Sequence, residues 1–166
     1  KAGGVPPASS CGGFNISSPP LVRVLRNRER PGMAKNFGRA VSLAREAGFD
    51  AVEIHAGHGY LISQFLSPYT NRRKDEYGGS LENRMRFMDM CMDEVMKAVG
   101  NDLAVFVKMT MRDGFKGGME IDETLQGARR LEQSGAHALV LSGGFVSRAT
   151  RSVVRGAMPI KPMPST

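Results

Sequence analysis

The sequence predicts an α/β fold built on a parallel sheet. Helical and strand-like segments alternate three times between residues 32 and 144, and the strand-like segment 103–109 is apolar at almost every position. Near-continuous apolar character is typical of a parallel strand that is covered on both faces. Alternation at this spacing favours right-handed crossovers. Three strands do not close an eight-stranded barrel, so the pattern fits either a small open sheet or a slice of a barrel.

The first helix and strand follow a loop-rich opening segment. Residues 1–31 are rich in glycine and proline pairs, which predicts a surface connection rather than a packed element. Residues 33–47 carry apolar side chains at the three/four spacing of a helix face, and Gly48 provides the stop. Residues 51–55 are predicted as the first strand.

The second helix and strand follow a long polar loop. Residues 56–79 are predicted as this loop, with apolar side chains that pack on the domain. Ser80 is a good N-cap, with Asn83 at the third helical position, and the helix is expected to end near Val99. The strand-like segment 103–109 follows.

The third helix and strand are shorter. After a glycine-rich loop, Asp122 is predicted to cap a helix that stops at Gly135, and residues 138–141 are predicted as a strand. Residues 145–166 form an irregular basic tail without a clear element. The middle region, 32–144, therefore contains all three helix–strand units.

Polar side chains gather at the ends of the three predicted strands. In a parallel sheet these ends lie on one rim, which is where α/β barrels place their active sites. The glycine pair allows a close approach of the backbone to a ligand, and a lysine at a strand end is costly unless it meets an anion or an electron-rich ligand. These residues are His55, His58 and Tyr60 after the first strand, Lys108 in the second, and Ser142, Gly143 and Gly144 after the third.

The two histidines allow three interpretations. Two imidazole N–H groups can polarise a carbonyl oxygen while Tyr60 supplies a proton. His55 and His58 also have His-x-x-His spacing, which occurs in zinc sites, but no suitable third ligand is evident nearby and no metal is predicted. The side chains could also be purely structural. The polar run 71–79 is interpreted mainly as loop scaffolding with Arg–Asp pairing.

Composition limits the function classes. Apolar content of 41% and charged content of 23% fit a soluble globular protein, and no apolar run is long enough to predict a membrane span. The net charge of +7 is spread without interleaved aromatic residues, so nucleic-acid binding is not predicted. Cys11 and Cys91 are too few for a disulfide framework, and a cytoplasmic setting is expected. The chain lacks an initiator Met and an apolar leader, so we interpret it as a piece of a longer protein.

Three ordered motifs, HAGHGYL at 55–61, QFLSP at 64–68 and NRRKDEYGGSLENRMRF at 71–87, closely resemble the old yellow enzyme family. The likeness extends over roughly residues 34–144 and implies a partial TIM (β/α)8 barrel, with about three of eight strands present. On this likeness, residues 1–166 are a fragment of a single FMN-binding barrel domain. The first strands and the phosphate-binding loops are expected outside it, as is the iron–sulfur cluster of one subgroup.

The resemblance implies an FMN-dependent oxidoreductase that takes hydride from NADH or NADPH. An activated alkene, or a quinone-like acceptor, then receives hydride from flavin N5. His55 and His58 match the pair that holds the substrate carbonyl, and Tyr60 matches the acid that protonates the neighbouring carbon. Lys108 stands where the family usually has an Arg beside the flavin, which keeps the charge but loses the planar fork. Ser142, Gly143 and Gly144 are assigned to the cofactor side of the site.

Further expectations concern the binding partners and the alternative functions of the chain. A small-molecule substrate is expected, without nucleic acid or membrane, and oligomerisation stays open. The leading alternative is a truncated, non-catalytic α/β piece that binds no flavin on its own. A His-x-x-His metal enzyme is the second alternative.

Overall fold

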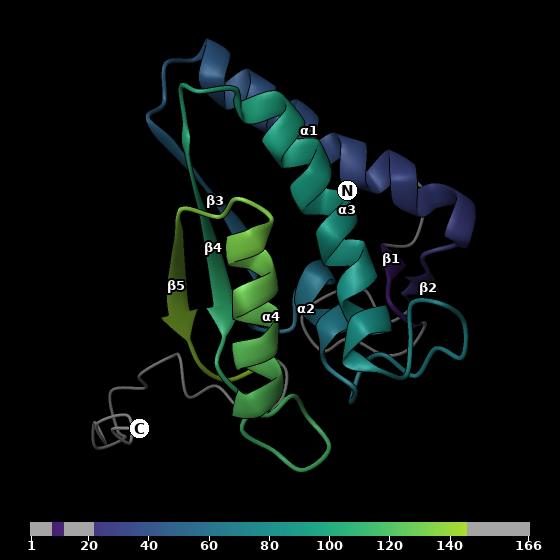
Figure 1. Cartoon of the computed structure of the whole chain (residues 1–166). Helices are drawn as coiled ribbons and strands as arrows, with labels where there is room; N and C mark the ends of the chain where they lie inside the picture. Colours follow the sequence, from purple (N-terminus) through teal and green to yellow (C-terminus); the bar gives the residue numbers. More distant parts are fainter. Residues whose placement is uncertain (1–7, 12–21, 146–166) are drawn as a thin grey trace, which may run out of the picture.

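A three-stranded parallel sheet lies at the centre of the computed structural model, which describes residues 8–11 and 22–145. Its strands lie in the order β3-β4-β5, and helices α3 and α4 connect them in sequence (Figure 1). The predicted parallel α/β arrangement is therefore confirmed. The bounds are β3 Ala51–Ala56, α3 Leu81–Val99, β4 Ala104–Thr110, α4 Ile121–Gln133 and β5 Ala138–Ser142.

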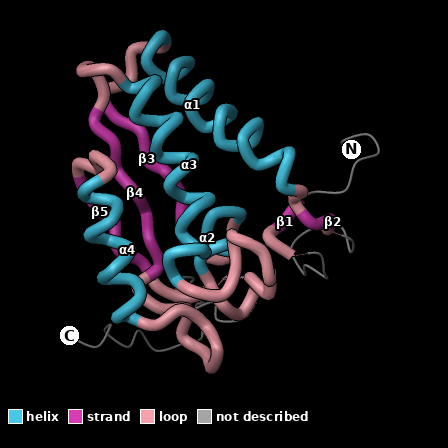
Figure 2. Tube along the Cα trace, turned by 45° about the vertical axis from the view of Figure 1, so that its right-hand side comes forward, coloured by secondary structure: helices cyan, strands magenta, loops and turns pink. Residues whose placement is uncertain are grey.

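Helices α3 and α4 lie on one side of the sheet (Figure 2). Alternate residues of β3 and β4 are buried on that side, where they join the methionine-rich stripe of α3 in the core. The residues between them point to the opposite face, which is more open. The buried set is Ile54, Ala56, Val105, Val107, Met109, Met85, Met88, Met92 and Val95.

Helix α3 forms as its sequence predicts. The Ser80 hydroxyl accepts a hydrogen bond from the Asn83 N–H at 3.3 Å, and Gly100 follows the last turn with a φ of 61°. Helix α1 (Arg30–Glu46) packs along α3, and a Cβ on Gly38 would lie 2.7 Å from the Glu94 carbonyl oxygen. The glycine therefore permits the close approach of the two helices.

The described part of the opening segment differs from its prediction as an unpacked surface loop. Strands β1 (Ala8–Ser9) and β2 (Arg23–Val24) pair in parallel, followed by the 3-10 helix η1 (Asn27–Glu29). Leu25 is fully buried, and so is Arg30, which begins α1 earlier than predicted. Residues 1–7, 12–21 and the predicted tail from 146 onward lie outside the described residues.

Two further elements differ from expectation. The predicted loop 56–79 contains helix α2 (Leu61–Leu66), whose apolar side chains pack down on the domain as expected. Helix α4 begins at Ile121 with Glu120 as its N-cap, so the predicted cap, Asp122, lies in the first turn instead. Within residues 8–11 and 22–145, no helix has the length and apolar character that crossing a membrane requires.

Candidate active site

The turn after β3 is held in an unusual backbone conformation. His58 has a φ of 59° and Gly59 a φ of 82°, so two consecutive residues adopt left-handed geometry. The His58 N–H donates to the Thr110 hydroxyl at 2.9 Å, and the Gly59 N–H donates to the Ser63 hydroxyl at 3.1 Å. The ring of Phe145 lies directly against Gly59. The turn is therefore anchored to the end of β4, to α2 and to the segment after β5.

The three proton-handling side chains of this turn lie together. The ring centroids of His55 and His58 are 5.1 Å apart, and those of His55 and Tyr60 are 5.0 Å apart. Tyr60 is 53% exposed, so its phenol is open to an incoming molecule. His55 Nδ1 is buried and has no hydrogen-bond partner among the described residues. The cluster can present two imidazoles and a phenol to one small ligand.

Lys108 lies beside this cluster. It is the register partner of His55, so both side chains point to the open face of the sheet. Its ammonium nitrogen lies 3.7 Å from a carboxylate oxygen of Glu53. A lysine at this strand end thus meets an anion, although the pair is only partly buried.

The surroundings of both imidazoles favour their neutral form. Burial lowers the pKa of His55, and the charges of His58 and Lys108 lower it further, while Glu53 opposes them. Burial and the charge of Lys108 also lower the pKa of His58. A neutral imidazole offers one N–H donor and one acceptor nitrogen.

The third strand brings Ser142 to the same rim. Its hydroxyl lies 2.6 Å from His58 Nε2, a contact that the sequence prediction did not include. Gly144 has a φ of 87°, and its N–H donates to the Arg112 carbonyl at 3.4 Å. Gly143 and Gly144 thus continue the chain past the rim, and their assignment to a cofactor stays a prediction.

The polar run 71–79 forms a scaffold below the site. Arg73 makes two-pronged contact with Asp75, as the interpretation of Arg–Asp pairing expected. The Asn71 amide donates to the carbonyls of Phe65 and Tyr77, both at 2.7 Å. This network connects α2 to the start of α3.

Sequence reasoning missed the hydroxyl group that supports the turn from α2. No sequence motif marks Ser63 as a hydrogen-bond partner of the turn. Its role depends on how α2 packs back against Gly59. Across the part of the chain that the structure describes, no three His, Cys, Asp or Glu side chains gather as metal ligands.

Comparisons with known proteins identify the family of the chain. A sequence profile of the NADH:flavin oxidoreductase / NADH oxidase family matches residues 13–163. The chain is 37% identical over 147 residues to 4,4'-dithiodibutanoate disulfide reductase of Rhodococcus erythropolis, covering 86% of this chain and 36% of that protein. It is 41% identical over 122 residues to NADPH dehydrogenase of Bacillus subtilis, covering 74% of this chain and 36% of that protein. The chain therefore spans little more than a third of the length of these two relatives.

Solved structures show the same fold. The old yellow enzyme homologue of Zymomonas mobilis superposes with a TM-score of 0.73 at 25% identity, covering 89% of this chain and 47% of that chain. A morphinone reductase complex with tetrahydroNAD superposes with a TM-score of 0.68 at 30% identity, covering 81% of this chain and 42% of that one. The three parallel strands are thus part of an old yellow enzyme-type TIM barrel. From the profile match and these likenesses together, the chain belongs to the NADH:flavin oxidoreductase / NADH oxidase family.

Proposed function

We propose that residues 1–166 are the central part of a longer FMN-binding barrel that reduces an activated alkene with hydride from NADH or NADPH. The observation that carries this proposal is the group of two imidazoles and one phenol, with neighbouring ring centroids 5.1 Å and 5.0 Å apart. An enone or enoyl substrate needs donors at its carbonyl oxygen and an acid near its α carbon, and this group supplies both.

The residues on the rim fit a flavin. Lys108 is the register partner of His55, and its ammonium group would offer a cation to the electron-rich edge of an isoalloxazine ring. We propose that Lys108, Ser142, Gly143 and Gly144 contact this cofactor. When bound, FMN supplies the hydride that it has taken from NADH or NADPH.

Each side chain of the turn has a separate proposed role. His55 and His58 donate N–H hydrogen bonds to the carbonyl oxygen, which draws electrons away from the alkene. Tyr60 donates its phenolic proton to the carbon next to that carbonyl. Because the imidazoles are neutral, they polarise the substrate without giving up a full proton.

The test uses the protein expressed from its complete coding sequence. We expect it to purify yellow and to oxidise NADH or NADPH faster when 2-cyclohexenone is added under anaerobic conditions. A colourless protein that cannot be loaded with FMN would favour the non-catalytic alternative. A yellow protein that reduces none of the enones tested would support flavin binding but contradict the proposed substrate class.

One relative suggests a second acceptor class. The protein of Rhodococcus erythropolis that matches 86% of this chain is described as a disulfide reductase. The same anaerobic assay with 4,4'-dithiodibutanoate compares the two acceptors. Faster turnover with the disulfide than with the enone would reassign the substrate.

A further inference from the structure

His58 is held by one hydrogen bond to its backbone and one contact to its imidazole. Its backbone N–H is bound to the Thr110 hydroxyl at 2.9 Å, and its Nε2 lies 2.6 Å from the Ser142 hydroxyl. The backbone of Ser142 is held in the sheet, because its carbonyl accepts from the Met111 N–H at 2.8 Å and it pairs in register with Thr110. With Nε2 engaged, Nδ1 is the ring nitrogen of His58 that makes no hydrogen bond within residues 8–11 and 22–145.

The distance between Ser142 and His58 allows the hydrogen bond to run in either direction, depending on the tautomer of His58. A serine hydroxyl can donate or accept, and a neutral imidazole nitrogen can do either. Among residues 8–11 and 22–145, the Ser142 hydroxyl makes no other hydrogen bond, so Nε2 is the one acceptor there to which its proton can be donated. A hydroxyl that donates to Nε2 leaves the single imidazole proton on Nδ1.

His55 has the opposite preference. Its Nδ1 is buried without a partner among the described residues. A buried N–H that makes no hydrogen bond is costly, so the proton of neutral His55 belongs on Nε2. The two neighbouring imidazoles thus differ in which nitrogen carries the proton.

We propose that Ser142 is a positioning residue that holds His58 in the Nδ1–H form, so that His58 Nδ1–H and His55 Nε2–H point to one ligand oxygen. The ligand part of this inference rests on the proposed function, whereas the proton positions do not. Ser142 would then orient His58 in addition to any contact that it makes with the cofactor.

Nitrogen NMR tests the proton positions directly. The enzyme is labelled with ¹⁵N-histidine, in flavin-free and flavin-loaded forms, and the resonances are assigned with His55→Gln and His58→Gln. Two-bond correlations from the ring protons show which nitrogen is protonated. We expect Nε2–H for His55 and Nδ1–H for His58 in the unaltered protein.

Variants then isolate the hydroxyl. Ser142→Ala is expected to shift His58 toward the Nε2–H form, and Ser142→Thr is expected to keep Nδ1–H because it retains the hydroxyl. Ser134→Ala removes a serine hydroxyl at the end of α4 and is expected to change neither histidine. An Nε2–H form of His58 in the unaltered protein would overturn the inference, as would an unchanged tautomer in Ser142→Ala.

Ligand binding separates this inference from the proposed function. Titration with 4-nitrophenol is expected to show about threefold to tenfold weaker binding to Ser142→Ala than to Ser142→Thr, the loss of one neutral hydrogen-bond donor. A tautomer change without weaker binding would support the role of Ser142 and count against His58 as a ligand donor. Weaker binding without a tautomer change would overturn the role of Ser142.

Discussion

His55 and Lys108 are register partners on the adjacent parallel strands β3 and β4, so an imidazole and an ammonium group share one face of the sheet. Burial lowers the pKa of His55 and that of His58 on the following turn, and the positive charge of Lys108 lowers both further. Glu53, 3.7 Å from the ammonium group, partly opposes this effect on His55. The strand pairing therefore adds to burial in favouring the neutral form of the candidate donors.

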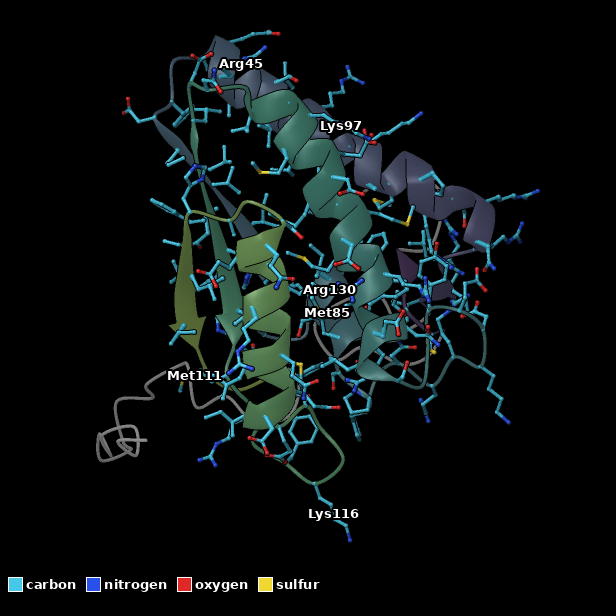
Figure 3. The ribbon with its side chains drawn as sticks, viewed as in Figure 1. Arg45, Met85, Lys97, Met111, Lys116 and Arg130 are labelled. Carbon is cyan, nitrogen blue, oxygen red and sulfur yellow. The ribbon has the colours of Figure 1, made fainter. Side chains whose placement is uncertain are left out.

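Replacing the ammonium group tests this electrostatic coupling. Lys108→Met is expected to raise the pKa of both His55 and His58, because a protonated imidazole no longer meets a like charge. An NMR titration of the two imidazoles measures the change. Lys116 points away from the sheet at the tip of the loop after β4 (Figure 3), so Lys116→Met is the matched control. Equal shifts in both variants would contradict a specific effect of Lys108.

Removing the phenolic proton tests the proposed acid. Tyr60→Phe is expected to slow alkene reduction by roughly 10²- to 10⁴-fold, the range typical of general acid catalysis. Reduction of the flavin by NADH or NADPH is expected to stay nearly unchanged, because that half-reaction does not need the proton. Stopped-flow absorbance at the flavin band follows each half-reaction separately.

The control for Tyr60→Phe is a phenol away from the rim. Among the described residues, the Tyr77 hydroxyl bonds only the Met90 sulfur, at 3.4 Å, so Tyr77→Phe is expected to leave both half-reactions intact. A similar loss in both half-reactions of Tyr60→Phe would contradict its proposed role.

Helix α3 and the parallel sheet could be predicted because local signals and tertiary packing agree. The cap at Ser80, the methionine stripe and the stop at Gly100 all mark one helix. Helix α2 is only six residues long and starts without a side-chain cap, so its sequence carries no comparable signal. Arg30 was expected in a loop, yet it is buried with its guanidinium 3.6 Å from the centroid of the Tyr77 ring.

Part of the candidate site also followed from the sequence. The proximity of His55 and Lys108 is a consequence of parallel pairing, which the apolar pattern indicates. The contact between His58 and Ser142 could not be predicted, because it depends on a left-handed φ at His58. Such a conformation at a non-glycine residue has no reliable sequence signature.

Asp75 is expected to stabilise the loop below the site. Its two oxygens bind Arg73, and Arg30 lies 3.2 Å away, which lowers the pKa of Asp75 from 3.8 to about 2. The stabilisation is therefore fully present above pH 3.8 and is lost as the pH falls toward 2. Asp75→Asn is expected to lower the free energy of unfolding by about 2 kcal/mol at neutral pH.

Urea unfolding across this pH range checks the Asp75 prediction. The difference between the unaltered protein and Asp75→Asn is expected to shrink as the pH falls from 4 to 2, in the interval set by its pKa. Glu82→Gln removes an exposed carboxylate that pairs with Arg86 on α3 and is expected to cost little. A constant difference at all pH values would mean that the ion pairs of Asp75 do not stabilise the fold.

Gly59 and Gly48 offer a matched pair for the turn that carries the candidate acid. Their φ angles are 82° and 81°, but a Cβ on Gly59 would lie 2.4 Å from the Phe145 ring, whereas nothing lies within 4 Å of one on Gly48. Gly48→Ala is expected to cost about 1–2 kcal/mol from backbone strain alone. Gly59→Ala is expected to cost about 1–3 kcal/mol more, because the added methyl group displaces the ring.

Urea unfolding of the two glycine variants measures this extra cost, and Phe145→Ala identifies its source. In the Phe145→Ala background the steric conflict is absent, so Gly59→Ala is expected to cost no more than Gly48→Ala. Displacement of the ring would also shift Tyr60, which follows Gly59 directly, so Gly59→Ala is expected to slow alkene reduction more than flavin reduction. Equal destabilisation by the two glycine substitutions in the unaltered background would show that Phe145 does not hold this turn in place.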